Sequence, residues 1–284
     1  MKPYYSALLL ICLMHSCANH GQLKLIEKLP QKLKENSGIV SFSASSAWFI
    51  EDNGNSDNIY KTDFNGNIIQ QFDVKNAKNN DWEDLTKDKK GNLYIGDFGN
   101  NANQRKNLVI YKAPNPEKEK GEKISIEKIK FKYPEQQNFP PRRGKLLYDA
   151  EAFFHYNGYL YIFTKNRANP FTGETSVYRV PDKKGTYEAE LMGTIRICSD
   201  WNTCQITSAD ISPDGKTIVL LSYGKLWTIT NFSNDDFAQG NLAEIDLGVR
   251  TQLESVCFTN NKLLLLSDEE RDDTGGNLYS YTLN

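Results

Sequence analysis

Short apolar runs recur along the chain in pairs, and each pair is separated by turn residues. In the stretch Glu83–Asp97, for example, two apolar runs flank Lys90-Gly91-Asn92. Gly and Asn favour tight turns, and alternating runs of this length favour β-strands. We therefore predict a chain built from β-hairpins, because no stretch shows a convincing helical period.

The hairpin unit repeats through the chain. Successive copies begin roughly 45 to 70 residues apart, a spacing that favours a β-propeller. The copies start at Ser37, Glu83, Glu151, Ala209 and Glu254. The sequence thus predicts an all-β propeller of five four-stranded blades, or of six if the widest spacing, between Glu83 and Glu151, conceals two copies.

The last copy, which ends near Leu283, supplies only three strands. We expect an N-terminal strand at Gln22–Leu29 to complete this blade and close the ring, since closure removes an exposed sheet edge. The fourth strands of blades two and three are expected at Lys123–Tyr133 and Glu188–Ile197.

The N-terminus has the pattern of an export signal. A basic start is followed by the apolar run Ala7–Met14, too short to span a bilayer, and then by Ser16 and Cys17. Leu13–Cys17 is similar to a bacterial lipobox, in which the Cys is lipidated. We predict a signal peptide (1–16), a lipidated tether (17–21) and one propeller domain (22–284); the alternative is signal cleavage without a lipid.

A lipid at Cys17 implies an exported outer-membrane lipoprotein that contacts the membrane through its anchor alone, on the periplasmic or the cell-surface side. The formal net charge of −2 gives no reason to expect a nucleic-acid partner, and we expect a monomer. An oxidising compartment favours a local disulfide between Cys198 and Cys204 over metal ligation, because no second Cys pair is present. Cys257 is expected to be a buried free thiol.

Acidic residues gather where the first strand of each unit begins and the second ends. Antiparallel pairing brings these points to one face of the propeller, around its central channel. The expected metal ligands on this face are Glu83, Asp84, Asp149, Glu151, Asp210 and Glu254. The expected ligand-binding residues are Asp97, Lys165, Arg167, Tyr223 and Arg271. The opposite face is expected to carry plain turns.

Carboxylates that converge repel one another unless a cation lies among them. Oxygen ligands in a flexible ring suit Ca²⁺ best, and no motif for zinc or an EF-hand is present. The alternative is that these acids accept hydrogen bonds from neighbouring blades and bind no metal.

Several motifs resemble those of exported bacterial propellers. Asp81-Trp-Glu-Asp84, Asp149-Ala-Glu-Ala152 and Gln252-Leu-Glu-Ser255 are similar to the blade-opening motifs of the SdiA-regulated and phytase-like propeller families. This resemblance implies a propeller with Ca²⁺ in or near the channel, and Glu83, Glu151 and Glu254 match the repeated Glu. Ser37 and Ala209 depart from it.

Two functional classes remain open. The first is a binding module that presents its acidic face to a small ligand, a glycan or a protein. The second is a metal-dependent hydrolase of phosphoesters or lactones that uses the same face. We favour the binding module because no nucleophile and base are paired in the sequence. The loop at Pro140–Arg143, with Lys145, is a separate candidate for binding an anion.

Overall fold

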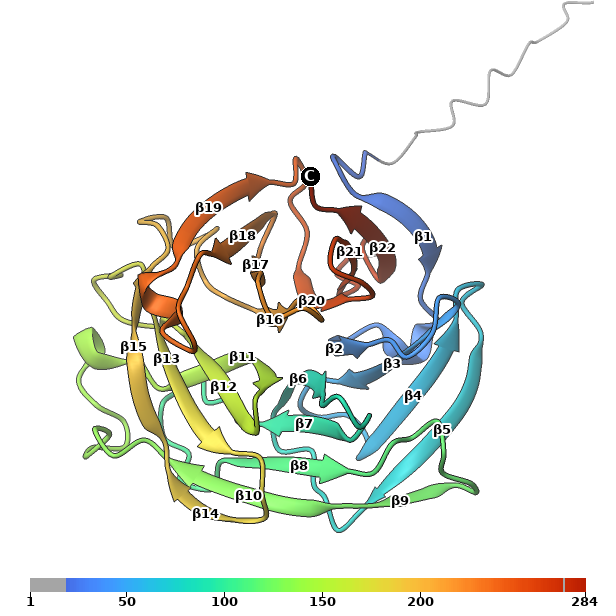
Figure 1. Ribbon diagram of the computed structural model, residues 1–284, viewed down its shortest axis with the longest axis horizontal. Helices are drawn as coiled ribbons and strands as arrows, with labels where there is room; N and C mark the ends of the chain where they lie inside the picture. The colour runs from blue at the N-terminus through green and yellow to red at the C-terminus, as the bar shows by residue number, and fades with distance from the viewer. Residues whose placement is uncertain (1–18, 273) are drawn as a thin grey trace, which may run out of the picture.

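The computed structural model describes residues 19–272 and 274–284, which form five β-sheets arranged around a common axis (Figure 1). Blade one contains β2 (Asn36–Val40), β3 (Ser46–Glu51), β4 (Asn58–Asp63) and β5 (Ile68–Lys75). Blade two contains β6 (Trp82–Lys87), β7 (Leu93–Asp97), β8 (Val109–Ala113) and β10 (Glu127–Lys132). Blade three contains β11 (Asp149–Tyr156), β12 (Tyr159–Lys165), β13 (Glu174–Pro181) and β15 (Glu190–Arg196).

The remaining blades follow the same order from the centre outward. Blade four contains β16 (Ser208–Ile211), β17 (Ile218–Ser222), β18 (Lys225–Thr230) and β19 (Asn241–Asp246). Blade five contains β20 (Leu253–Phe258), β21 (Leu263–Asp268), β22 (Asn277–Thr282) and β1 (Lys24–Lys28). The 3₁₀ helices are η1 (Gln31–Leu33), η2 (Arg143–Lys145) and η3 (Phe237–Gln239).

The ring closes through its first strand. β1 pairs antiparallel with β22, from Lys24 opposite Ser280 to Lys28 opposite Asn277. The inner strands β2, β6, β11, β16 and β20 contact one another in this order, and β20 contacts β2 again. The predicted five-bladed propeller, with a blade completed by the N-terminal strand, is therefore confirmed, and the six-bladed alternative is wrong.

Two short strands that the sequence did not predict pair with the outer edges of neighbouring blades. The run expected as the fourth strand of blade two splits into β9 (Lys123–Ser125) and β10, and β9 pairs in parallel with β5 of blade one. The run expected for blade three follows β14 (Gly185–Glu188), which pairs in parallel with β10 of blade two. These additions cover sheet edges that would otherwise expose unpaired backbone groups.

The core lies between the blades. Five clusters of buried side chains fill the five inter-blade spaces, and aromatic residues such as Trp48, Trp82 and Phe154 are at most 2% exposed. Alternation along each strand provides these two apolar faces, because successive side chains point to opposite sides of a sheet.

The cysteines among the described residues agree with prediction. Cys198 and Cys204 form a disulfide with Cα atoms 5.7 Å apart, and Cys257 is a buried free thiol. The signal peptide and the lipidation site Cys17 lie outside the described residues. Within those residues, no helix has the length and apolar character needed to cross a membrane.

Candidate functional site: the acidic mouth of the channel

A β-bulge recurs at one end of the inner strands. The register between first and second strands skips one residue in four blades: Ser37, Glu83, Glu151 and Glu254. These are the starts of the repeats identified in the sequence. A bulge re-aims a side chain, so three of the four turn a glutamate toward the same end of the channel. Blade four pairs without such a skip, from Ser208 to Ile211, and has no glutamate there.

Three carboxyl groups from blades one and two meet at this end. Each of Asp52, Asp81 and Glu83 offers an oxygen atom, and the three atoms lie within 4.8 Å of one another. Glu83 is 8% exposed and Asp81 is 7% exposed. Among residues 19–272 and 274–284, no side chain or backbone N–H donates a hydrogen bond to the Glu83 carboxyl group. We call this group of three the acidic cluster.

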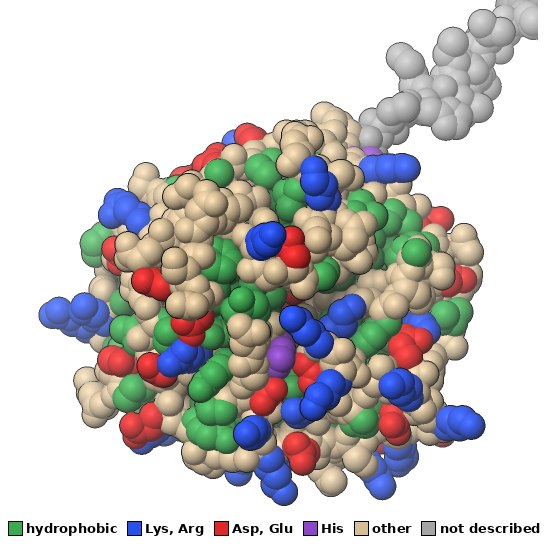
Figure 2. All heavy atoms as spheres, viewed as in Figure 1, with side chains coloured by type: hydrophobic (Ala, Val, Ile, Leu, Met, Phe, Trp, Pro, Cys, Tyr) green, Lys and Arg blue, Asp and Glu red, His purple; other side chains and the backbone are tan. Residues whose placement is uncertain are grey.

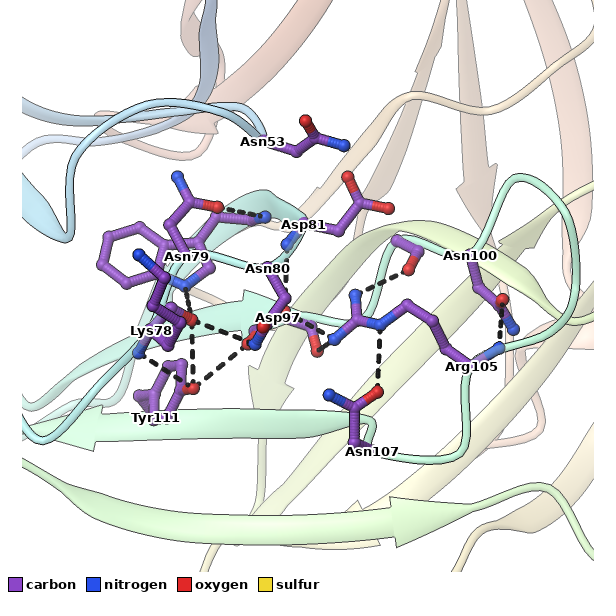
Figure 3. Close-up of polar contacts among 12 residues, drawn as sticks. Asn53, Lys78, Asn79, Asn80, Asp81, Asp97, Asn100, Arg105, Asn107 and Tyr111 are labelled. Carbon is purple, nitrogen blue, oxygen red and sulfur yellow. Dashed lines mark hydrogen bonds and ion pairs between the residues drawn. The ribbon is translucent and has the colours of Figure 1, made fainter.

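The loops that carry the acidic cluster are held by a fixed polar network (Figure 3). Asp97 is fully buried and accepts hydrogen bonds from the Asp81 backbone N–H (3.1 Å), the Tyr111 hydroxyl (3.1 Å) and Arg105 (2.7 Å). Asn79 donates to the carbonyls of Glu51 and Asp52, each at 2.9 Å. Asp97, predicted to bind ligand, is thus occupied in positioning Asp81.

Gly99 leaves space beside the acidic cluster. A Cβ atom at this position would overlap the Glu83 carboxyl group and come within 2.5 Å of Asp81 Cγ. Its carbonyl accepts a hydrogen bond of 2.7 Å from Arg105, which fixes the backbone there. Glycine is therefore required if both carboxyl groups are to approach each other at this point.

Burial and like charge make the ionised cluster unfavourable. Burial, followed by the negative charges of Glu151 and Asp52, raises the pKa of Glu83 well above its usual value. Burial raises the pKa of Asp52 to about 7, and it also raises that of Asp81. Glu269, just after β21, has a pKa raised to about 9 by burial and by the charge of Glu254. A cation at this site would remove these penalties.

The other side of the mouth is already neutralised. Lys165, buried at the end of β12, forms an ion pair with Glu151. Arg167 contacts Asp149 through Nε and Glu151 through Nη2, each at 2.7 Å. Burial alone would lower the pKa of Lys165, but the charges of Glu151 and Glu254 raise it above its ordinary value. Both cations therefore stay charged and committed to carboxylates.

A hydrogen-bonded chain connects this basic side to blade five. Lys165 donates to the Tyr223 hydroxyl (3.3 Å), which donates to Glu254 Oε1 (2.9 Å). Exposed Arg271 donates to Gln252 (2.9 Å), whose amide in turn faces Glu269 (3.3 Å). The predicted ligand-binding residues Lys165, Arg167, Tyr223 and Arg271 therefore surround one mouth, opposite the acidic cluster.

Two predicted metal ligands lie elsewhere. Asp84 is fully buried and accepts hydrogen bonds from Phe153 N (3.2 Å), Ala209 N (3.4 Å) and the Ser208 hydroxyl (3.2 Å), so it joins blades two, three and four. Asp210 accepts from Phe258 N at 2.7 Å. Both carboxyl groups accept hydrogen bonds from backbone and hydroxyl donors of neighbouring blades, which is the alternative to metal binding considered above. Asp84 and Asp210 are therefore not part of the candidate site.

The opposite end of the channel is not made of plain turns alone. A cavity of about 1180 Å³ lies there, lined by the far ends of all five inner strands, and Asp210 and Cys257 contribute to it. Asp88, His155 and Asp182 have oxygen and nitrogen atoms within 4.8 Å of one another, and His155 Nε2 contacts Asp182 at 2.9 Å. Figure 2 shows basic and acidic side chains mixed around a histidine at the centre of one face.

Two members of the acidic cluster were not predicted as metal ligands: Asp52 was not singled out, and Asp81 was noted only as part of a motif. The signal that was available is the Asp81-Trp-Glu sequence, in which an acid precedes the bulged Glu83 by two residues. The closeness of Asp52 arises from contact between blades and has no local signature.

Comparisons with known proteins bear on the fold. No protein-family model and no curated protein matches the sequence. Among solved structures, the chain is similar to the PQQ-bound aldose sugar dehydrogenase of Streptomyces coelicolor, with a TM-score of 0.51 and 9% identity, over 92% of this chain and 97% of that one.

Two further structures are more distant. A gluconolactonase from Xanthomonas campestris has a TM-score of 0.45 and 10% identity, over 84% of this chain and 69% of its own. YCF48 bound to a D1 peptide has a TM-score of 0.44 and 12% identity, over 87% of this chain and 63% of its own. At these identities only the likeness to the sugar dehydrogenase carries weight, and it concerns the fold: the chain is a β-propeller.

Proposed function

We propose that the protein is an exported binding module, tethered to the outer membrane by a lipid on Cys17, whose acidic channel mouth holds Ca²⁺ and takes a ligand there. One observation carries the proposal. Glu83 is more than nine-tenths buried, it is turned by a bulge into the acidic cluster, and it has no hydrogen-bond or ion-pair partner among the described residues.

The donor set fits a hard divalent cation. Asp52, Asp81 and Glu83 supply only oxygen atoms, from a bulged strand and two loops, and such sets favour Ca²⁺ over zinc or copper. Gly99 keeps the space between Asp81 and Glu83 free of a side chain. When bound, the cation would supply the positive charge that lets an anionic or polyhydroxylated ligand approach an otherwise negative mouth.

The geometry favours binding over hydrolysis. A hydrolase would need a free base or a free cation beside the metal. Lys165 and Arg167 are both committed to Glu151 and Asp149, and no imidazole from the described residues lies in this group. Arg271 is then suited to orienting a ligand, because its exposed guanidinium group donates one side-chain hydrogen bond, to Gln252. The Tyr223 hydroxyl is held between Lys165 and Glu254 and would contact a ligand from a fixed position.

Calcium titration of the mature protein tests the proposal. We expect Ca²⁺ at one hundred times its dissociation constant to raise the free energy of unfolding by about 2.7 kcal/mol. Glu83→Gln should remove this response and also stabilise the metal-free protein, because it removes a buried carboxyl group that must either hold a proton or carry a charge without a partner. Gly99→Ala should abolish the response as well, since the added methyl group separates the two carboxyl groups.

The matched control is Glu127→Gln, which changes an exposed glutamate on β10 and should leave the calcium response intact. A metal-free Glu83→Gln protein that is less stable than wild type would instead assign Glu83 to blade pairing. Turnover of 4-nitrophenyl phosphate or a δ-lactone by the calcium-loaded protein, lost in Glu83→Gln, would replace the binding module with the hydrolase.

A further inference from the structure

The cavity at the end of the channel opposite the acidic cluster is large enough for a small organic ligand. Its volume is about 1180 Å³, and residues from all five blades line it. Its apolar walls include Phe42, Tyr156 and Phe258, which end or follow the inner strands of blades one, three and five. Pockets with apolar walls and a few polar groups commonly bind small molecules.

Lys87, at this cavity, reaches from blade two to blade one. It is the last residue of β6 and is half-buried, and its ammonium group donates a hydrogen bond to the Ser41 carbonyl. The ammonium group also lies 4.7 Å from the centre of the Phe42 ring. Among the described residues it forms no ion pair with a carboxylate. Because a lysine has three N–H donors, two remain for a ligand.

The charge of Lys87 also acts on blades four and five. Burial raises the pKa of Asp210, on β16, to about 6, and the positive charge of Lys87 partly offsets this rise. Burial likewise raises the pKa of Cys257, on β20, to about 12, and Lys87 again opposes the rise. A ligand that contacts Lys87 is therefore placed near the channel axis, where the blades meet.

The acidic groups of the lining are already bound by donors of the protein. Asp210 accepts from two backbone N–H groups, at 2.7 and 2.8 Å, and Asp88 accepts from two more, each at 2.9 Å. Asp182 contacts His155 Nε2 at 2.9 Å, and Asp214 accepts from a neighbouring hydroxyl group at 2.6 Å. These aspartates therefore have few free lone pairs for a ligand.

The basic groups of the lining are not paired with carboxylates. In the part of the chain that the structure describes, this holds for all five lysines that line the cavity: Lys87, Lys89, Lys90, Lys112 and Lys183. Lys112 donates to a backbone carbonyl at 3.0 Å, and Lys89, Lys90 and Lys183 are exposed at the rim. Figure 2 shows Lys and Arg side chains on several sides of the central histidine. The cavity therefore offers free donors to an anion.

We propose that this cavity binds a small phosphate monoester. Lysine is a compact point charge that can approach a tetrahedral phosphate from several directions, and the described lining contains no arginine, whose planar fork suits a carboxylate. Lys87 pairs with the phosphate near the axis, and Phe42, Tyr156 and Phe258 contact the organic body of the ligand. The site needs no metal and lies at the other end of the channel from the acidic cluster, so it is independent of the function proposed above.

Calorimetric titration of the mature protein in EDTA tests the proposal. The ligands are AMP, glucose 6-phosphate and inorganic phosphate, with uncharged adenosine and glucose for comparison. We expect AMP or glucose 6-phosphate to bind with a dissociation constant below about 1 mM, and more tightly than inorganic phosphate or the uncharged compounds. Which of the two binds better distinguishes an aromatic body from a sugar. Because EDTA removes calcium, Glu83→Gln should bind as wild type does.

Lys87→Gln should weaken this binding about tenfold, the size expected for one charge-assisted contact. Glutamine keeps an N–H donor for the Ser41 carbonyl, which favours folding of the variant. The double variant Lys90→Gln/Lys183→Gln changes only exposed side chains and should weaken binding about threefold, so it decides the question if Lys87→Gln does not fold.

Lys216→Gln is the matched control, because it changes an exposed lysine of the neighbouring turn that does not line the cavity. It should leave the dissociation constant unchanged. Absence of binding by both esters at about 10 mM, or equally tight binding of adenosine and glucose, would overturn the proposal. So would a weakening by Lys216→Gln as large as that of the double variant, because general electrostatic attraction would then explain the binding.

Discussion

Glu269 shows how its surroundings alter a single carboxyl group. Burial raises its pKa to about 9, and the negative charges of Glu254 and Asp52 add to this shift. Asp52 has a pKa raised to about 7, chiefly by burial. In the absence of a bound cation, these groups therefore retain protons at a pH where exposed carboxyl groups have lost them.

These raised pKa values predict how stability depends on pH. The pKa of Glu269 is about 9 in the folded protein and 4.5 ordinarily, so the folded protein binds this proton more tightly than the unfolded chain does. The stabilisation that results is complete below pH 4.5 and is lost as the pH rises through about 9. We expect the Tm of the metal-free protein to fall between pH 5 and 9, and Ca²⁺ to reduce this fall. Glu269→Gln should flatten the profile in thermal unfolding.

Glu244→Gln, on the exposed outer strand β19, provides the comparison and should keep the wild-type profile. A metal-free Tm that rises steadily from pH 5 to pH 9 would contradict the raised pKa values.

The repeated glutamates were predictable at this scale because they occupy one position of a repeat. Asp52 and Gly99 were not, because their importance depends on distances between loops.

The strand β1 shows how much one element contributes to the closed ring. Leu29 follows β1 directly and is 5% exposed, whereas Leu25 within β1 is 42% exposed. Leu29 packs in the cluster between blades five and one. Comparing substitutions of the two leucines therefore separates the effect of side-chain burial from the effect of backbone pairing in this part of the chain.

We expect Leu29→Ala to lower the free energy of unfolding by about 3 kcal/mol, since it leaves a cavity in an inter-blade core. Leu25→Ala should change it by less than about 0.5 kcal/mol. Urea unfolding of both variants measures the difference. Equal effects of the two substitutions would mean that β1 contributes only backbone pairing to the ring.

The four main strands of each blade were predictable, and so was the closing strand. The short strands β9 and β14 were not: β9 belongs to a run that continues into β10, and β14 precedes the run expected for blade three. Whether such a run stays in one sheet or divides depends on the edge offered by the neighbouring blade. Local pattern contains no information about that edge.

At the scale of the molecule, Asp84 connects three blades near the axis. Its burial raises its pKa well above the usual value, while the backbone N–H donors of Phe153, Leu85 and Ala209 oppose that rise. We expect Asp84→Asn to destabilise the protein by about 2 kcal/mol, because an amide NH₂ group would face N–H donors. The stabilisation by calcium, measured by urea unfolding with and without Ca²⁺, should remain.

Loss of the calcium response in Asp84→Asn without loss of stability would make Asp84 part of the cation site.

The five-bladed architecture was predictable because every blade repeats the same local hairpin chemistry. The sequence did not predict that one side of the mouth is neutralised and the other side is acidic and unpaired. That division depends on which carboxylates Lys165 and Arg167 contact in the folded protein.

The pairing of β1 with β22 also has a consequence for how the protein is made. The part of the domain synthesised first finds its partner only when the last strand has emerged. Until then the outer strand β1 has no partner in blade five, and no shortened intermediate can form the complete ring. Loss of the few C-terminal residues that contain β22 would leave β1 unpaired as well, so a truncation at one end of the gene product would expose both ends to degradation.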